Sequence, residues 1–431
     1  MNLSTCSSLG LALIGSVTLL SAAEPHRVSM KQTAEGAWQL EYDGKPFFVR
    51  GAGGQQHLDV LVESGGNMIR TWGIESLVEK VDGKTLVDRA RSHKLLIAAG
   101  IWVEHERHGF DYGDQRRVTQ QREKIRKDVA RWKHEPTIGF WGLGNEMEGP
   151  MSDGKGIQIW KELEELAKIV KKEDPSRLIM TVIAGASADK VKGIKTHCPS
   201  IDIIGINAYA AASGSGQAVK QAGWEKPFIL SEFGPMGHWE VAQTAWKAPI
   251  EPSSRQKAAK YYAVHQHVVE ASGGLCVGSF AFLWGQKQER TSTWYGMFLK
   301  SGEKLPPVDA MAKAWTGKWP KNRCPRVELF SSTAEQKTVD PGSTVHVAMK
   351  ASDHEGAALS YEWKIAGEST DHKAGGDAEA VPPETPIKVS STGDGRWHFK
   401  APAKAGEYRL FLVVRDGHGA ASAENFPFRV R

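Results

Sequence analysis

The pattern of apolar and polar positions changes once along this 431-residue chain, near residue 320. Before that point, short apolar runs alternate with longer segments whose apolar residues recur at helical spacing, among them Val118–Trp132, Gly156–Lys172 and Ser254–Ala271. The apolar runs are Phe47–Gly51, Asn67–Trp72, Leu95–Trp102, Ile138–Gly144, Leu178–Ile183, Ile201–Asn207, Phe228–Ser231 and Val277–Trp284. Eight predicted strands that alternate with helices over about 250 residues indicate a (β/α)8 TIM barrel.

A hairpin signal precedes the first run, with a predicted strand at Trp38–Tyr42 followed by the turn Asp43–Pro46. We therefore expect residues 27–319 to form the barrel together with a short N-terminal β-hairpin. A doubly wound parallel sheet is the structural alternative. The number of runs and the lack of a glycine-rich phosphate-binding turn after the first of them favour the barrel.

After a predicted linker at residues 320–325, short strand signals separated by turn residues predict a small all-β module over residues 326–431. Its length and pattern favour an immunoglobulin-like β-sandwich. Trp363 and Tyr408 stand where the core tryptophan and corner tyrosine of such sandwiches are found, and they are equally compatible with ordinary core aromatics.

The N-terminus predicts an export signal over residues 1–23, because the apolar stretch Leu9–Leu20 is followed by the small residues Ser21, Ala22 and Ala23. No Lys or Arg precedes the apolar stretch, so a disordered leader is the alternative. The stretch is too short to span a membrane, and no later segment is apolar enough to do so. We expect a secreted or periplasmic protein.

Charge and cysteine content exclude several classes of function. The net charge of +5 is small and shows no basic stripe, so we expect no nucleic acid partner. Cys198, Cys276 and Cys324 follow the leader and do not make a disulfide framework; one bridge with a free thiol and three reduced thiols both remain open. No ligand spacing predicts a metal, and we expect no cofactor. The sequence gives no indication of the oligomeric state.

Two glutamates follow apolar runs of the predicted barrel, Glu146 after the fourth run and Glu232 directly after the seventh. Functional residues of TIM barrels lie at the C-terminal ends of strands, so we expect the two carboxylates to face one another across one cleft. Hydrolysis of a glycosidic bond needs such a pair, one as proton donor and the other as nucleophile or base. Asn145 precedes Glu146 and could bind a sugar hydroxyl.

Further polar and aromatic residues fall at the same predicted rim of the barrel. Arg70 could pair with Glu232, Tyr209 could donate a hydrogen bond to it, and Trp284 could offer an apolar face to a sugar ring. An ordinary ion pair for Arg70 and core packing for Trp284 are the alternatives. The full set of candidate substrate-binding residues is Arg70, Trp72, Glu104, His105, Asn145, Asn207, Tyr209 and Trp284.

The chain resembles glycoside hydrolase clan A, and most closely the TIM-barrel domain of family 2 glycosidases, over residues 27–317. The matching segments are Phe47–Gly51, Ile69–Gly73, Trp141–Glu146, Gly205–Tyr209, Ser231–Gly234 and Phe282–Trp284. The resemblance implies that Glu146 is the acid/base and Glu232 the nucleophile of a retaining mechanism. Family 2 enzymes usually carry sandwich domains before the barrel, whereas here the predicted sandwich follows it. The C-terminal module resembles polycystic-kidney-disease-type or fibronectin-like domains.

We therefore expect a retaining β-glycosidase that acts on a carbohydrate substrate, with a β-glucan or β-glucoside favoured. A β-glucan transglycosylase that uses the same site is one alternative, and a non-catalytic carbohydrate-binding protein is the other. The loops after the third and eighth strands, Glu104–His108 and Gln286–Arg290, carry charges of both signs, so acidic sugars stay open. Trp239, Trp246, Trp294 and Tyr295 lie in or near late rim loops and could stack on further sugar units.

Overall fold

The predicted TIM barrel is confirmed by a computed structural model that describes residues 27–147, 155–271 and 274–431. Eight parallel strands close into one barrel, and each begins at or within two residues of the start of a predicted apolar run. In order around the barrel they are β4 (Val49–Gly53), β5 (Met68–Arg70), β8 (Leu96–Ile101), β9 (Ile138–Leu143), β10 (Ile179–Ala184), β11 (Ile203–Asn207), β12 (Phe228–Phe233) and β13 (Cys276–Ala281).

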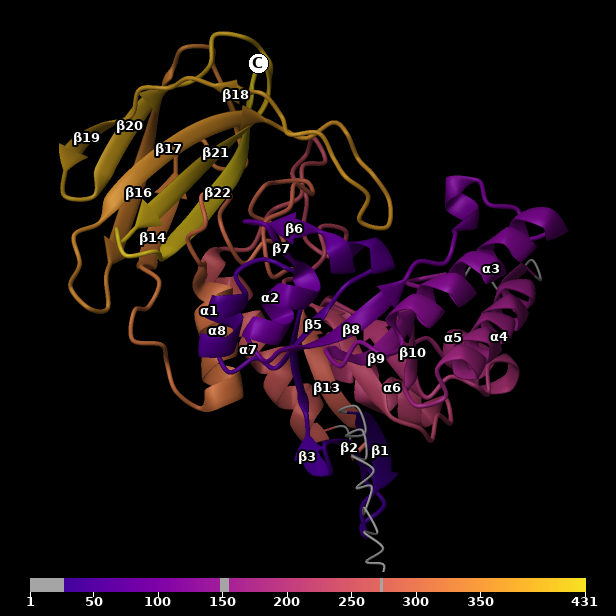
Figure 1. Cartoon of the computed structure of the whole chain (residues 1–431). Helices are drawn as coiled ribbons and strands as arrows, with labels where there is room; N and C mark the ends of the chain where they lie inside the picture. Colours follow the sequence, from indigo (N-terminus) through magenta and orange to yellow (C-terminus); the bar gives the residue numbers. More distant parts are fainter. Residues whose placement is uncertain (1–26, 148–154, 272–273) are drawn as a thin grey trace, which may run out of the picture.

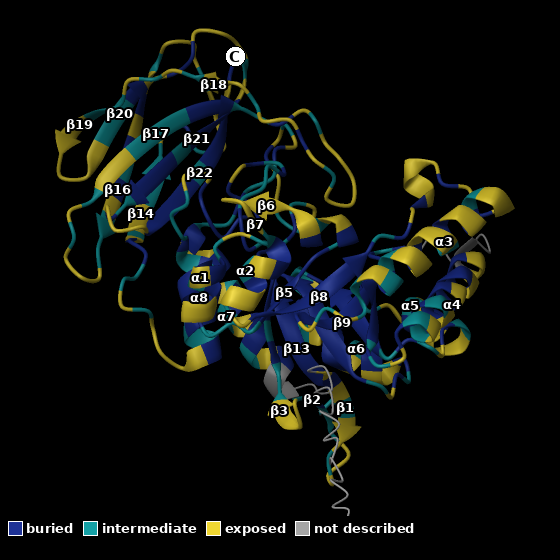
Figure 2. Ribbon diagram, viewed as in Figure 1, coloured by how far each residue is buried: buried dark blue, intermediate teal, exposed yellow. Residues whose placement is uncertain are grey.

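Burial on both faces explains why these strands read as continuous apolar runs. Every residue of β8, β9, β12 and β13 is buried, and the barrel strands form the dark interior of Figure 2. Helices surround them: α1 (Leu58–Glu63), α2 (Leu86–Ser92), α3 (Gln115–Trp132), α4 (Lys155–Glu173), α5 (Ala188–His197), α6 (Ser215–Gln221), α7 (Ser254–Ala271) and α8 (Pro306–Thr316). Helix α3 begins where the Asp114 side chain accepts hydrogen bonds from the first-turn amides.

A small antiparallel sheet covers the amino end of the barrel, as Figure 1 shows. It consists of β1 (Val28–Gln32), β2 (Trp38–Tyr42) and β3 (Lys45–Phe47). Val28 and Leu40 of this sheet pack with the lower barrel residues Met68 and Phe140 in one apolar cluster. The sheet therefore leaves the opposite, carboxyl end of the barrel uncovered. The predicted export signal lies outside the described residues.

Two further sheets follow the barrel and form an all-β module consistent with a β-sandwich. One contains β14 (Arg326–Ser332), β16 (Thr344–Ser352), β20 (Arg396–Lys400) and β19 (Ser390–Gly393); the other contains β15 (Thr338–Val339), β22 (Ala421–Val430), β21 (Gly406–Arg415), β17 (Ser360–Gly367) and β18 (Glu384–Thr385). The Tyr408 hydroxyl donates to Lys404 O at 3.0 Å, as a tyrosine corner does. The immunoglobulin-like class stays a prediction.

The sandwich packs directly on the barrel. Leu299 and Leu305 from the barrel form an apolar cluster with Val413, Ala421 and Ala423 of the sandwich. Figure 1 shows that a long loop between β17 and β18, residues 368–383, leaves the sandwich and reaches over the carboxyl end of the barrel. We refer to it as the β17–β18 loop. It brings a distant part of the chain to the end of the barrel where β9 and β12 end.

The described cysteines are buried free thiols, so the option of three reduced cysteines holds in this structure. Burial raises the pKa of Cys198 to about 12 and that of Cys276 to about 12. Within the described ranges, no helix combines the length and the apolar character that crossing a membrane requires.

Candidate active site

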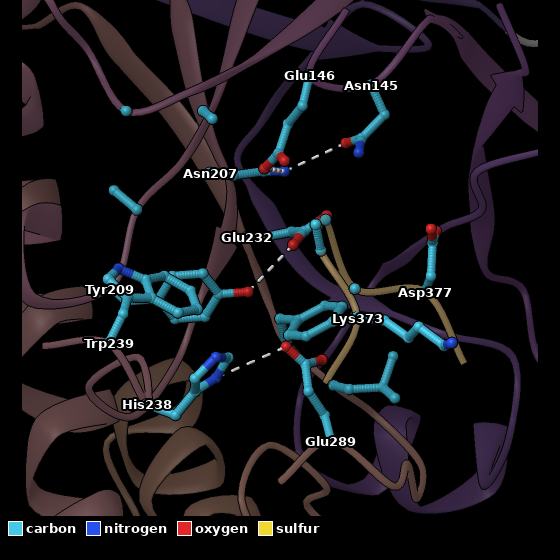
Figure 3. A pocket seen from close by; sticks show the side chains of 18 of the residues that line it. Asn145, Glu146, Asn207, Tyr209, Glu232, His238, Trp239, Glu289, Lys373 and Asp377 are labelled. Carbon is cyan, nitrogen blue, oxygen red and sulfur yellow. Dashed lines mark hydrogen bonds and ion pairs between the residues drawn. The ribbon is translucent and has the colours of Figure 1, made fainter. Parts of the chain in front are cut away.

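Glu146 and Glu232 line one cavity of about 720 Å³ at the carboxyl end of the barrel. Glu146 follows β9 and Glu232 belongs to β12, the fourth and seventh strands in barrel order. Figure 3 shows both carboxylates directed into this cavity, with Asn207 and Tyr209 beside them. The strands therefore bring together two acids that the sequence places far apart.

Three side chains donate hydrogen bonds to the carboxylate of Glu232. Arg70 Nη1 and Trp72 Nε1 donate to Oε1 at 2.8 and 3.0 Å, and the Tyr209 hydroxyl donates to Oε2 at 3.2 Å. Arg70 is also the ionic partner of Glu232, and both side chains are buried. Three donors, one of them a cation, stabilise the negative charge of this buried carboxylate and fix its direction.

Tyr209 lies in the loop after β11, and its surroundings determine the protonation state of its hydroxyl. Burial, together with the nearby charge of Glu232, raises the pKa of the Tyr209 hydroxyl well above its ordinary value. The tyrosine therefore stays protonated and acts as a donor at neutral pH. Its ring also packs edge-on against Trp239 at a centroid distance of 5.6 Å, which restricts its rotation.

An amide network holds the second acid. Asn207 Nδ2 donates to Glu146 Oε1 at 2.8 Å and to Asn145 Oδ1 at 3.2 Å, while Asn207 Oδ1 accepts from Ser231 Oγ at 2.9 Å. Arg70 Nη2 donates to the same Asn145 oxygen at 2.7 Å. The two glutamates are thus linked through Arg70 and two asparagines, which fixes their relative positions.

The backbone turns sharply where β9 delivers Glu146 to the cavity. Gly144 has φ 73° and Glu146 has φ 52°, so both lie in the left-handed region. This conformation suits glycine but costs a glutamate roughly 1–3 kcal/mol, and such strain is commonly found at functional sites. The turn lets Glu146 face Glu232 instead of continuing along the strand.

Four of the predicted site residues lie outside the cavity lining, and one of them, Arg70, acts on the site through Glu232. Trp284 is buried beneath the rim, where its Nε1 donates to His57 O at 3.1 Å, and its ring packs on Phe298 and Trp315. It has no free face for a sugar, because core packing covers its ring.

The other two residues outside the lining, Glu104 and His105, belong to the loop after β8. Glu104 is exposed, and its carbonyl accepts from Tyr112. His105 is buried and stacks on Trp102 at a centroid distance of 4.8 Å. Burial lowers the pKa of His105 to about 4, so the ring is neutral at pH 7. Trp102, which is not among the predicted residues, lines the cavity in their place.

The structure adds lining residues that sequence reasoning did not place in the site. Phe282, His238 and Glu240 come from the loops after β13 and β12, and the charged loops named above supply Arg107, Lys287 and Glu289. The β17–β18 loop contributes a further group, Lys373, Ala374, Gly375, Gly376 and Asp377. Burial lowers the pKa of His238 to about 4, so it too is neutral at pH 7.

Among the described residues, no group of three or more His, Cys, Asp or Glu side chains is arranged to hold a metal ion. The chemistry that these residues themselves can perform is proton transfer and nucleophilic attack by a pair of carboxylates.

Residues 92–244 match the family model of glycosyl hydrolases family 2, TIM barrel domain. No curated protein matches the chain. Among solved structures, the chain is similar to Bacteroides uniformis β-glucuronidase, with a TM-score of 0.50 and 13% identity over 94% of this chain and 48% of that one. It is also similar to a family 2 β-galacturonidase from Eisenbergiella tayi bound to galacturonate, with a TM-score of 0.51 and 15% identity over 68% of this chain and 54% of that one.

This chain thus spans about half the length of the two solved proteins, and at these identities the likeness concerns the fold. The family match lies within the barrel and includes Glu146 and Glu232. Residues 92–244 of the barrel are therefore similar to the TIM-barrel domain of glycosyl hydrolases family 2.

Proposed function

We propose that the protein is a retaining β-glycosidase that hydrolyses O-glycosidic bonds of a β-linked glycoside or polysaccharide. The observation that carries the proposal is a pair of carboxylates directed into one cavity from the fourth and seventh strands. Arg70, Trp72 and Tyr209 donate hydrogen bonds to Glu232, and Asn207 donates to Glu146. Such a pair can supply one nucleophile and one proton donor.

In the first step, Glu232 attacks the anomeric carbon while Glu146 delivers its proton to the leaving oxygen. The C–O bond to the leaving group breaks, and a covalent ester forms between the sugar and Glu232. Arg70 and Trp72 direct Oε1 and Tyr209 directs Oε2, so the attacking oxygen needs little reorientation.

In the second step, Glu146, now ionised, takes a proton from water, and the water oxygen displaces Glu232 from the anomeric carbon. Two inversions give net retention of the β configuration. Asn207 stays within hydrogen-bond distance of Glu146 and can hold the same oxygen through both steps. We propose β-glucosides and β-glucans as the first substrates to test.

We also propose that the protein is exported from the cytoplasm. N-terminal sequencing of the protein recovered outside the cell tests this proposal.

The two roles are tested by removing each carboxylate and adding azide. Glu232→Gly should lower turnover of a nitrophenyl β-glycoside more than about 10³-fold, and azide should restore release with the α-glycosyl azide as product, because azide enters from the vacated face. Glu146→Gly with azide should give the β-glycosyl azide, because the ester on Glu232 forms first. Product configuration is read by proton NMR.

If Glu232→Gly gave the β-glycosyl azide and Glu146→Gly the α-glycosyl azide, the two roles would be reversed. A Glu232→Gly protein that kept most of the wild-type rate would overturn the proposal. A wild-type protein that binds β-glucans but releases no sugar from a panel of nitrophenyl β-glycosides and β-linked polysaccharides would be a binding protein. Transfer products that dominate over free sugar at high acceptor concentration would identify a transglycosylase.

A further inference from the structure

The barrel leaves part of its own rim unused around the cavity. In order around the barrel, lining residues follow β8, β9, β10, β11, β12 and β13. Of the described residues, none that follows β4 lines the cavity, and Trp72 alone does so after β5. The wall of the cavity is therefore incomplete over the first two strands if only the barrel is considered.

The β17–β18 loop fills this gap. It is joined to the rim after β8 through Asp377, which lies 3.1 Å from His108 Nε2 and 3.8 Å from Arg107 Nη2. On the other side, Lys287 Nζ in the loop after β13 donates to Gly376 O at 2.6 Å. The loop therefore bridges the third and eighth strand ends across the gap, and it lines the same cavity as Glu232; Figure 3 shows Lys373 and Asp377 of the loop in the view of this cavity.

The base of the β17–β18 loop is fixed, so its position is defined by the fold. Arg290 N donates to Glu379 Oε2 at 2.6 Å, and Arg409 Nη2 of the adjacent strand β21 donates to Pro249 O of the barrel at 2.8 Å. Within the loop, Ala380 N donates to Asp371 Oδ2 at 2.9 Å. The C-terminal part of the loop and the adjacent strand β21 are thus both bonded to the barrel.

Among the described residues that line the cavity, each Lys or Arg side chain has a carboxylate partner. Arg107 faces Asp377, Lys287 Nζ lies 2.8 Å from Glu289 Oε2, and Lys373 Nζ lies 2.7 Å from Asp371 Oδ1. An anionic sugar would have to displace one of these carboxylates and would meet its charge at close range. A sugar hydroxyl both donates and accepts, so a wall of paired opposite charges fits neutral sugars.

We propose that the C-terminal sandwich forms part of the substrate-binding site. Its β17–β18 loop contacts the bound sugar, and the paired charges of this wall select a neutral glycone over a uronic acid. The inference rests on the proposed glycosidase function and specifies the substrate class of the same site.

The contact is tested with Asp377→Ala, which removes the partner of Arg107 and His108 and releases the loop. KM for a neutral nitrophenyl β-glycoside should rise at least 5-fold, while kcat changes less than 3-fold because both glutamates keep their hydrogen bonds. Asp340→Ala is the matched control, since it removes the Asp340–Arg431 ion pair at the exposed surface of the same sandwich and should leave both constants unchanged. An unchanged KM in a folded Asp377→Ala protein would overturn the contact.

The charge argument is tested by comparing kcat/KM for a neutral glycoside and for the uronide of the same configuration. The wild-type protein should prefer the neutral substrate at least 100-fold. Glu289→Gln leaves Lys287 without its carboxylate, so the ratio of uronide to neutral turnover should rise at least 10-fold. Glu384→Gln removes an exposed charge that pairs with Lys364 of the sandwich and should not change the ratio.

Equal wild-type turnover of the two substrates, or no change in the ratio for Glu289→Gln, would overturn neutral selection and leave the glycosidase function standing. A wild-type protein that turns over no glycoside of either kind would overturn the proposed function and this inference with it.

Discussion

Glu232 is fixed by three side chains from two different parts of the barrel rim. Arg70 ends β5, Trp72 follows it, and Tyr209 follows β11, so the carboxylate is held from two sides of the barrel. The two carboxylate oxygens of Glu232 have separate donors. If the donor to one oxygen is lost, the hydrogen bonds to the other oxygen remain. Each donor should therefore contribute separately to the reaction.

We expect Tyr209→Phe to lower kcat about 10- to 100-fold, which corresponds to the roughly 1.5–3 kcal/mol of a hydrogen bond to a charged group. The ring and its packing on Trp239 are kept, so the effect reports the hydroxyl. Steady-state kinetics on a nitrophenyl glycoside measures it. Tyr408→Phe, which removes a tyrosine hydroxyl in the sandwich, should leave kcat unchanged; a Tyr209→Phe protein with wild-type kcat would contradict the role of the hydroxyl.

At this scale the strand pattern positions residues on strand ends, whereas predicted loop residues lie either in the cavity lining, as Tyr209 does, or outside it, as Trp284 does. Arg70 and Asn207 end barrel strands, and alternation along a strand determines which side of the sheet they face. Trp284 lies three residues beyond β13, and His105 lies beyond β8, where the loop backbone sets the direction of the side chain. Both are buried against neighbours that no local pattern identifies.

Between the elements, β8 lies very close to the segment after β5. A Cβ at Gly100 would lie 2.3 Å from Thr71 O and 2.4 Å from the carbonyl carbon of Trp72, both backbone atoms. Gly100 therefore allows Trp72 to reach the position from which it donates to Glu232. A Cβ at Gly142, the residue paired with Gly100 on β9, would have no neighbour closer than 3.6 Å.

Gly100→Ala should displace Trp72, lower kcat and destabilise the fold by about 1–3 kcal/mol, as overpacking does in a close-packed interior. Gly142→Ala adds the same methyl group on the neighbouring strand at ordinary contact distance and should stay close to wild type. Thermal unfolding and kcat measured on both variants compare the two sites. If the two substitutions had equal effects, Gly100 would not be required for the close approach of β8 to Trp72.

The elements themselves were predictable because strands buried on both faces leave a strong signal in the sequence. Helix α7 has the predicted bounds Ser254–Ala271, and β9 begins at the predicted Ile138. The β17–β18 loop could not be assigned to the site, because its contacts with Arg107 and Lys287 join segments far apart in the chain. Only the packing of the sandwich on the barrel brings them together.

Across the whole molecule, acidic groups are buried where the sandwich meets the barrel. Glu424 of β22 accepts from Ser254 N at 3.2 Å, and burial raises the pKa of Glu424 to about 8. The native state thus holds a proton on Glu424 between pH 4.5 and 8, where an unfolded chain has released it. Stability that is fully present below pH 4.5 is therefore lost as pH rises towards 8.

Glu424→Gln keeps the acceptor for Ser254 without an ionisable group, so its stability should not follow this pH dependence. Between pH 6 and pH 9 we expect the variant to gain about 2–3 kcal/mol relative to the wild type, or roughly 4 °C in unfolding temperature. Thermal unfolding followed by circular dichroism at the two pH values measures it. Glu384→Gln, at an exposed site, should follow the wild type; a Glu424→Gln protein that loses as much stability as the wild type over this range would contradict the assignment.

The reacting groups and one wall of the pocket belong to different domains of the chain. The two glutamates belong to the barrel, whereas the wall formed by residues 373–377 belongs to the C-terminal sandwich, more than 140 residues further along the chain. Recombination that exchanged the C-terminal module would therefore replace one side of the pocket in a single event while the reacting groups stayed intact. Such an exchange would alter the substrate contacts of this wall and leave Glu146 and Glu232 in place.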